Sequence, residues 1–326
     1  MKRAVSLVPS VTDILVALGA GDLLVGISAD CDQPVPSDPR PVVTRPMISP
    51  AAAAVDPAGV DAAVRQQLGS GGLLYSLDVE LVVKLAPEVV FAQDSCAVCA
   101  LPSSEVVAAL ADRGLVCDVV SLDPVDLDDV LASFATVARA VGLGNAGAAL
   151  EAACRLRLAA LRPTDGGVAG GGVAGGGVAG GGVAGGRRPR IAVLDWVDPL
   201  FLAGNWVPDL VRAVGAEPVL YQRGSGSREI TLEALAASHP DLVVVAPCGL
   251  DLEAASEATE GLRGRLAAVE ELIGTPVIPV DGRVWFSRPG PRLVDGAEAL
   301  AAWLAGAAGG VRRTTVTTEA SDDEHR

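Results

Sequence analysis

Apolar runs of strand length alternate with longer helical stretches along most of the chain. The runs of strand length lie at 4–8, 24–28, 89–92, 115–121, 191–194, 242–245 and 277–280. Stretches with helical spacing or helix-ending residues separate them, at 10–18, 79–85, 106–111, 127–141, 146–161, 207–214, 232–237, 252–268 and 291–304. Strands that alternate with helices in this way are typical of parallel sheets with crossover helices. The pattern therefore predicts an α/β chain.

A glycine-rich repeat divides the chain into two halves. Residues 166–186 repeat Gly-Gly-Val-Ala-Gly with a period of five residues. Glycine at this density does not offset the entropy cost of ordering, so a flexible insertion is expected. The predicted organisation is an N-terminal lobe at 1–145, a helix at 146–165, the insertion at 166–186, a C-terminal lobe at 187–305 and a disordered tail at 306–326.

Charge and hydropathy narrow the classes of partner. The net charge is −15, which argues against nucleic acid and anionic membranes because both need a basic face. No stretch reaches the roughly 18 apolar residues of a membrane helix, so no membrane insertion is expected. The apolar run after Met1-Lys2-Arg3 ends at Val8, which is short for a signal peptide. The chain as written is expected to be cytoplasmic and monomeric, or extracytoplasmic if an export signal lies outside this sequence.

The two halves share a sequence motif. Glu80 and Glu233 each stand seven residues before a proline, which is followed by an acidic residue, an apolar strand and a cysteine. A short helix that leads into a buried strand explains most of this pattern in any α/β protein. That explanation does not account for the matched positions of the glutamates and the cysteines.

Four of the six cysteines follow predicted strands, on the side where open parallel sheets bind ligands. They are Cys31, Cys96, Cys99 and Cys248. Four thiolates can hold zinc or an iron–sulfur cluster, although such sites usually show two Cys-x-x-Cys pairs and this chain has one. Small residues that line a ligand site explain the same four positions, and both interpretations stay open. Cys117 and Cys154 are expected to pack in the core.

Aromatic residues make up 3% of the chain, so their clustering is informative. Two segments that follow predicted strands carry the candidates for a ligand wall, namely Trp196, Phe201 and Trp206 in the first and Trp285, Phe286 and Arg288 in the second. Flat apolar walls suit a large planar ligand, and an arginine can meet its polar periphery. Trp303 is expected in a helix core. With two histidines and no phosphate-binding loop, acid–base catalysis is poorly supplied.

The opening of the chain resembles the class III substrate-binding proteins of ABC importers, which bind cobalamin, haem or ferric siderophores. The resemblance rests on Val5-Ser-Leu-Val-Pro-Ser-Val-Thr-Asp-Ile-Leu-Val-Ala-Leu-Gly19, on Leu24-Val-Gly-Ile-Ser28 and on the Cys-Asp-Gln-Pro turn that follows. Asp198-Pro-Leu-Phe-Leu-Ala-Gly204 and the segment from Trp285 to Arg292 make the cobalamin-binding branch the nearest. The resemblance covers the chain apart from the glycine repeat and the tail.

The resemblance implies two Rossmann-like lobes with parallel sheets, joined by a single long connecting helix, and a ligand cleft between the lobes. It implies docking on an ABC permease through one carboxylate of each lobe, here Glu80 and Glu233. Arg45 stands where cobalamin binders place a tryptophan, and it is taken as a ligand-binding candidate.

The resemblance leads to the expectation of a binding protein and not an enzyme. It would bind cobalamin or a related corrinoid for ABC-type uptake or intracellular handling, with no required cofactor. Two alternatives stay open: a haem or ferric-siderophore receptor, and a cytoplasmic protein that uses Cys31, Cys96, Cys99 and Cys248 to hold zinc or an iron–sulfur cluster.

Overall fold

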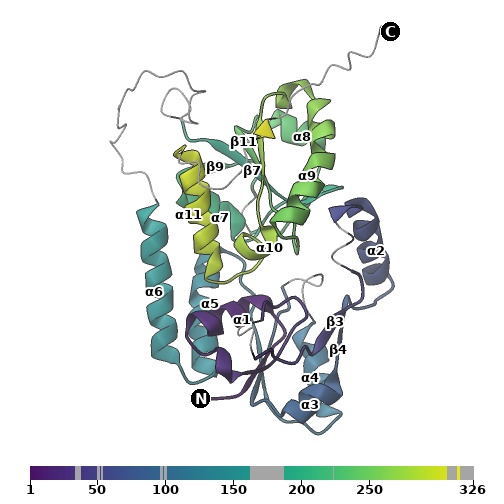
Figure 1. Cartoon of the computed structure of the whole chain (residues 1–326), viewed down its shortest axis with the longest axis vertical. Coiled ribbons are helices and arrows are strands. Elements are labelled where there is room, and N and C mark those ends of the chain that lie inside the picture. The colour runs from purple at the N-terminus through teal and green to yellow at the C-terminus, as the bar shows by residue number, and fades with distance from the viewer. Residues whose placement is uncertain are drawn as a thin grey trace.

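The computed structural model describes residues 1–33, 38–49, 52, 54–95, 98, 101–161, 187–222 and 224–306, together with the backbone of 314–315. The glycine repeat lies outside these residues, and so do Cys96, Cys99 and His325. The described chain forms two α/β lobes, one above the other in Figure 1, with a long helix running beside them. The expected fold class is confirmed.

The N-terminal lobe is built on a four-stranded parallel sheet. In spatial order its strands are β2 (Leu24–Ile27), β1 (Ala4–Ser6), β5 (Val89–Ala92) and β6 (Asp118–Ser121). Its helices are α1 (Pro9–Ala17), α3 (Val79–Leu85), α4 (Ser103–Ala111) and α5 (Leu127–Ala140). One sheet face packs with α1 and α5, and the other packs with α3 and α4. Every residue of β5 is buried, as expected of a strand covered on both faces.

One part of this lobe was not foreseen from the sequence. A separate antiparallel pair joins β3 (Thr44–Pro46) and β4 (Tyr75–Leu77), and helix α2 (Pro57–Gly69) lies between them in the chain. Asp56 accepts a hydrogen bond from the Gly59 amide, and proline stands at the first helical position, so α2 begins at a regular cap. None of its residues is buried.

The C-terminal lobe has a mixed sheet around a parallel centre. In spatial order its strands are β10 (Arg228–Ile230), β8 (Leu200–Leu202), β7 (Arg190–Val197), β11 (Leu242–Val245), β12 (Pro276–Pro279) and β13 (Thr314–Thr315), with β9 (Glu217–Pro218) also beside β7. The centre, β7-β11-β12, is parallel as predicted, whereas β8 turns back on β7, and β10 and β13 add antiparallel pairs. Thr314 and Thr315, within the tail that was predicted to be disordered, pair with β12.

Helices cover both faces of this second sheet. They are α7 (Val207–Ala213), α8 (Leu232–Ala237), α9 (Leu252–Ala267), α10 (Gly282–Trp285) and α11 (Arg292–Leu304). Residues of α7 and α11 pack on one face, and residues of α8 and α9 pack on the other. The three-layer arrangement of the first lobe is thus repeated.

Helix α6 (Gly144–Ala160) runs alongside both lobes (Figure 1). Its Arg157 forms ion pairs with Asp295 and Glu298 of α11, at 2.7 and 2.6 Å. One apolar cluster also continues from the first lobe into the second, and contains Phe134 of α5 as well as Leu210 of α7. Because this core is shared, the lobes are held together by packing on the α6 side.

Candidate functional site

The segments that follow the strand ends of the two lobes contact each other. On one side, Arg288, which follows α10, donates to the Asp30 carbonyl after β2 at 2.6 Å. On the other side, Trp196 at the end of β7 donates to the Pro57 carbonyl at the start of α2 at 3.2 Å. Figure 1 shows the same arrangement, with α10 above α1 and α2 beside the upper lobe. The carboxyl ends of both sheets therefore face one interface.

A group of charged residues, which we call the arginine cluster, occupies the α1 side of this interface. It consists of Asp13, Asp30, Asp32, Arg288 and Arg292. The Arg288 guanidinium lies 2.9 Å from the Asp32 carboxylate and 3.8 Å from that of Asp13, and its side chain is 6% exposed. Arg292 reaches the same Asp32 oxygen at 3.1 Å. The buried guanidinium of Arg288 therefore links the two lobes.

The surroundings of the two carboxylates shift their pKa values in opposite directions. Burial raises the pKa of Asp13 to about 6, although Arg288 and Arg292 oppose the shift. One Asp13 oxygen is buried and has no hydrogen-bond partner among the described residues. Burial also opposes ionisation of Asp32, but the guanidinium group of Arg288 and two further arginines lower its pKa. The pairing with Arg288 therefore favours ionised Asp32.

The opposite side of the interface, which we call the aromatic corner, consists of Pro57 and Arg65 of α2 with Trp196, Phe201 and Glu229 of the C-terminal lobe. Arg65 lies with its guanidinium carbon 5.7 Å from the centre of the Phe201 ring. The same guanidinium lies 2.9 Å from the carboxylate of Glu229. Two of the aromatic candidates from the sequence, Trp196 and Phe201, thus lie at the interface. Arg65 was not a candidate from the sequence.

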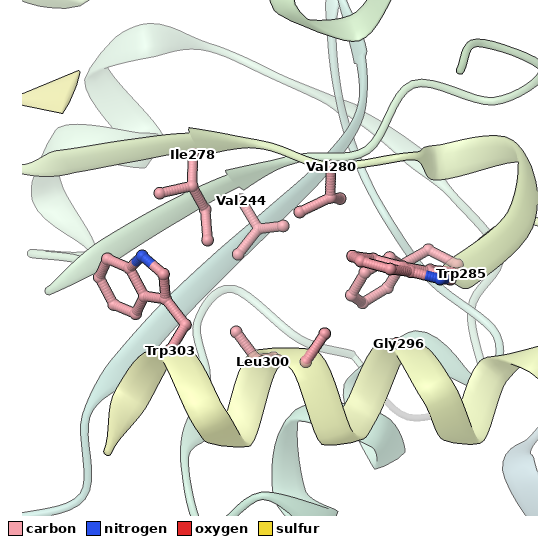
Figure 2. A pocket seen from close by; sticks show the side chains of 9 residues that line it. Val244, Ile278, Val280, Trp285, Gly296, Leu300 and Trp303 are labelled. Carbon is pink, nitrogen blue, oxygen red and sulfur yellow. The ribbon is translucent and has the colours of Figure 1, made fainter. Parts of the chain in front are cut away.

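Three other aromatic candidates lie inside the C-terminal lobe. Trp206 is buried, and its indole N–H donates to the Phe286 carbonyl at 2.7 Å, while Phe286 itself is 3% exposed. Figure 2 shows Trp285 with its ring directed into a small hollow between the sheet and α11, opposite Trp303. That hollow holds about 10 Å³, roughly one water molecule. Core packing explains these aromatics, so they are left out of the candidate site.

The cysteine candidates are only partly described. Cys31 is half-buried and accepts a hydrogen bond from the Thr12 hydroxyl at 3.1 Å, and burial raises the pKa of its thiol to about 11. Cys248 is exposed after β11. Among the described residues, no three His, Cys, Asp or Glu side chains are grouped so as to hold a metal ion. The proposed four-cysteine site would also need Cys96 and Cys99, which lie outside the described residues.

Asp195 is joined to Cys248 by a backbone hydrogen bond. Asp195 lies at an irregularity in β7. Its carboxylate accepts a hydrogen bond from the Ser227 hydroxyl, and its backbone carbonyl accepts one from the Cys248 amide. Burial raises the pKa of Asp195 to about 6, and in the part of the chain that the structure describes its second carboxylate oxygen has no hydrogen-bond partner. Arg45, by contrast, is an exposed residue of β3 opposite Ser76. Neither residue is in contact with the arginine cluster or the aromatic corner through a described hydrogen bond.

The sequence motif shared by the halves has a structural counterpart. Glu80 is the second residue of α3 and Glu233 the second of α8, and both side chains are exposed. Each helix is followed by a left-handed residue, Ala86 or His239, then by proline and a buried strand. Glu80 also pairs with Arg113. The two carboxylates therefore occupy equivalent places on the two lobes.

A larger hollow lies within the N-terminal lobe. It holds about 390 Å³ and is lined by residues of β4, α4 and the segments around them, including Tyr75, Leu101 and Val106. Gln67, in the last turn of α2, also lines it. The hollow separates the end of α2 from the body of its own lobe.

Comparisons with known proteins agree with this architecture. No protein-family model and no curated protein sequence matches the chain. A periplasmic haem-binding protein from Pseudomonas aeruginosa is 20% identical over 98% of this chain and 100% of its own, with a TM-score of 0.63. A periplasmic vitamin B12-binding protein of Vibrio cholerae is 16% identical over 94% and 98%, with a TM-score of 0.55.

A possible iron-binding periplasmic protein from Staphylococcus epidermidis is 17% identical over 93% of this chain and 98% of its own, with a TM-score of 0.60. At these identities the likeness shows the fold. The chain has the two-lobed fold of the class III periplasmic solute-binding proteins. In the part of the chain that the structure describes, no helix has the length and apolar character required to cross a bilayer.

Proposed function

We propose that this protein binds a metal-bearing tetrapyrrole, cobalamin by preference, between its two lobes, and that it is a receptor and not a catalyst. The observation that carries the proposal is the meeting of strand-end segments from both lobes, with aromatic side chains at one end. Open parallel sheets bind ligands beyond the carboxyl ends of their strands. Solved structures with this fold include haem-binding and vitamin B12-binding proteins.

The aromatic corner suits a macrocycle. Trp196 and Phe201 are half-buried at the interface in a chain that is poor in aromatic residues. Flat rings offer a large apolar area at a low cost in side-chain entropy. A planar ligand that enters between the lobes would therefore find its apolar contacts here.

The supply of metal ligands favours cobalamin over haem. A haem receptor holds iron through His, Tyr, Met or Cys. Among the described residues, His239 precedes β11 at its amino end, Met47 and Tyr75 line the hollow in the N-terminal lobe, and Tyr221 lies under an arginine. Cys248, exposed after β11, is the candidate iron ligand at a strand end. The thiol of Cys31 is protonated at neutral pH because its pKa is about 11. A cobalamin carries its own lower axial base, so it needs no ligand from the protein.

The equivalent positions of Glu80 and Glu233 support a role in delivery to an ABC-type permease. Two exposed carboxylates, one on each lobe, would let a partner with two basic sites recognise both lobes together. Uptake from outside the cell and handling within it both require the same binding step.

Calorimetric titration tests the proposal, with cobalamin, hemin and a ferric siderophore as separate ligands. We expect saturable binding of one cobalamin per chain, and weaker binding of the other two. Trp196→Leu should weaken cobalamin binding about tenfold, because one aromatic contact contributes roughly 1 kcal/mol or more beyond the buried area. Trp303→Leu removes an indole that lines the small hollow between the C-terminal sheet and α11, and it serves as the matched control.

The variant Cys248→Ala distinguishes cobalamin binding from hemin binding. The variant should bind cobalamin as the wild type does, whereas hemin binding that depends on this exposed thiol would be lost. Tight hemin binding with no cobalamin binding would mean that the ligand is haem and not cobalamin. A protein that binds no tetrapyrrole at high micromolar concentration would overturn it.

A further inference from the structure

Helix α2 belongs to the N-terminal lobe by sequence, but it is poorly packed on that lobe. It has no buried residue, and none of the described elements contacts it extensively. The hollow of about 390 Å³ lies between its last turn and the body of the lobe. Gly71 and Gly72 follow the helix, and Gly71 has a φ of +76°. The helix is therefore attached to its own lobe mainly through its ends.

The contacts of α2 are instead with the other lobe. Its Val60 packs against the apolar cluster of the C-terminal sheet, and the Pro57 carbonyl accepts from Trp196. Arg65 lies over the ring of Phe201 and pairs with Glu229. A helix that is loosely held by its own lobe thus closes one side of the interface.

The contacts between α2 and the C-terminal lobe are weak. The side chains of Arg65 and Glu229 are each 53% exposed, and exposed ion pairs hold weakly. Arg65 also pairs at 2.6 Å with Asp61, one turn earlier in α2, so its charge is compensated after it leaves Glu229. Regions with few buried contacts open locally without global unfolding.

We propose that α2 is a lid on the tetrapyrrole site, and that Arg65 is the residue that closes it by covering the ring of Phe201 until a ligand arrives. This inference rests on the proposed function, since it names the element that regulates access to that site. Opening of α2 uncovers Trp196 and Phe201, and a planar ligand takes the place of the guanidinium over the ring.

Hydrogen exchange of the full-length protein without ligand tests the lid directly. The amides of α2 should exchange at least about tenfold faster than those of α5 and α6, because α2 opens locally. Arg65→Gln should speed exchange of α2 about threefold to tenfold, since it removes the ion pair with Glu229 and the cation–π contact with Phe201 that join α2 to the C-terminal lobe, together with the ion pair to Asp61 within α2. Glu229→Gln should act in the same direction.

Arg155→Gln is the matched control. Arg155 forms the same pair of contacts as Arg65, with Glu151 one turn earlier at 3.0 Å and with Asp128 of a neighbouring helix at 2.5 Å, but within the α5–α6 pair. This variant should leave exchange of α2 unchanged. Stopped-flow mixing with cobalamin should show faster association for Arg65→Gln and wild-type association for Arg155→Gln.

The outcomes separate the lid from the proposed function. Exchange of α2 as slow as that of α6, or unaltered by Arg65→Gln, would overturn the lid whatever the protein binds. If α2 opens in a protein that binds no tetrapyrrole, its assignment to that site is overturned, and the failure lies with the proposed function. Faster exchange of α2 on addition of cobalamin, because the ligand takes the place of the Arg65 guanidinium over Phe201, would support both.

Discussion

The guanidinium of Arg288, carried by the C-terminal lobe, lies 2.9 Å from the carboxylate of Asp32 in the N-terminal lobe. The same buried group donates to the Asp30 carbonyl and lies near Asp13. Removing one partner of a buried ion pair leaves the other charge desolvated and uncompensated. The contact therefore fixes the position of one lobe against the other as well as contributing to stability.

Replacing Arg288 with alanine should destabilise the protein by about 3 kcal/mol, at the low end of the range for a buried pair because Asp32 is partly exposed. Arg292→Ala is the matched control, since Arg292 meets the same carboxylate but is 42% exposed. It should cost less than about 1 kcal/mol. Urea unfolding of both variants measures the difference. Equal losses would mean that burial of Arg288 does not decide its contribution.

The stability of the protein should depend on the ionisation of Asp13. Its pKa is raised to about 6 in the folded protein, so the folded state binds this proton more tightly than the unfolded state does. The stabilisation from the proton is complete below the unfolded pKa of about 4 and is lost as the pH rises through about 6. Between about pH 4.5 and about pH 7.5 the loss amounts to roughly 2 kcal/mol.

Asp13→Asn keeps this position neutral at every pH and should remove that part of the pH dependence. Urea unfolding of wild type and variant at both pH values gives the comparison. Asp195 titrates in both proteins, so its contribution cancels in the difference. A variant with the same decline as the wild type would show that Asp13 does not change its protonation over this range.

Trp206 and Trp196 should respond differently to replacement by phenylalanine. Trp206→Phe leaves the buried Phe286 carbonyl without its donor and should cost about 1–3 kcal/mol, with cobalamin affinity unchanged. Trp196→Phe removes the indole N–H that is shared between the Pro57 and Asp198 carbonyls at the half-exposed interface, so it should cost less than about 1 kcal/mol and weaken binding. Unfolding and calorimetry on both variants measure the two effects. A binding loss in Trp206→Phe at full folding would place its indole in the site.

The strands were predictable because of how they are buried. The run Val89–Ala92 is covered on both faces and reads as an uninterrupted apolar segment, and the structure gives the same bounds. Helix α2 left no such pattern, since none of its faces is buried. Its start signal, Asp56-Pro57, was present in the sequence, but its alanines carried little weight in an alanine-rich chain.

Candidate residues could be predicted only within single segments. Trp196 and Phe201 were candidates because they follow a predicted strand, and both contact α2 at the interface between the lobes. Trp206 follows the same strand but turns into the core, which depends on the packing of α7 and Phe286. The link between Arg288 and Asp32 spans the two lobes, and no local periodicity relates such distant positions.

Two helical glycines test the packing of α6 against α5. A Cβ added at Gly147 would lie 2.4 Å from the Ala138 Cβ and 2.8 Å from the Phe134 carbonyl oxygen, whereas one added at Gly261 of α9 meets nothing within 4 Å. Gly147→Ala should therefore destabilise the protein by about 3 kcal/mol, since α6 has to move away from α5. Gly261→Ala should stabilise it by about 1 kcal/mol through helix propensity alone. Thermal or urea unfolding of the two variants decides, and a stabilising Gly147→Ala would show that α6 is not seated against α5 at this distance.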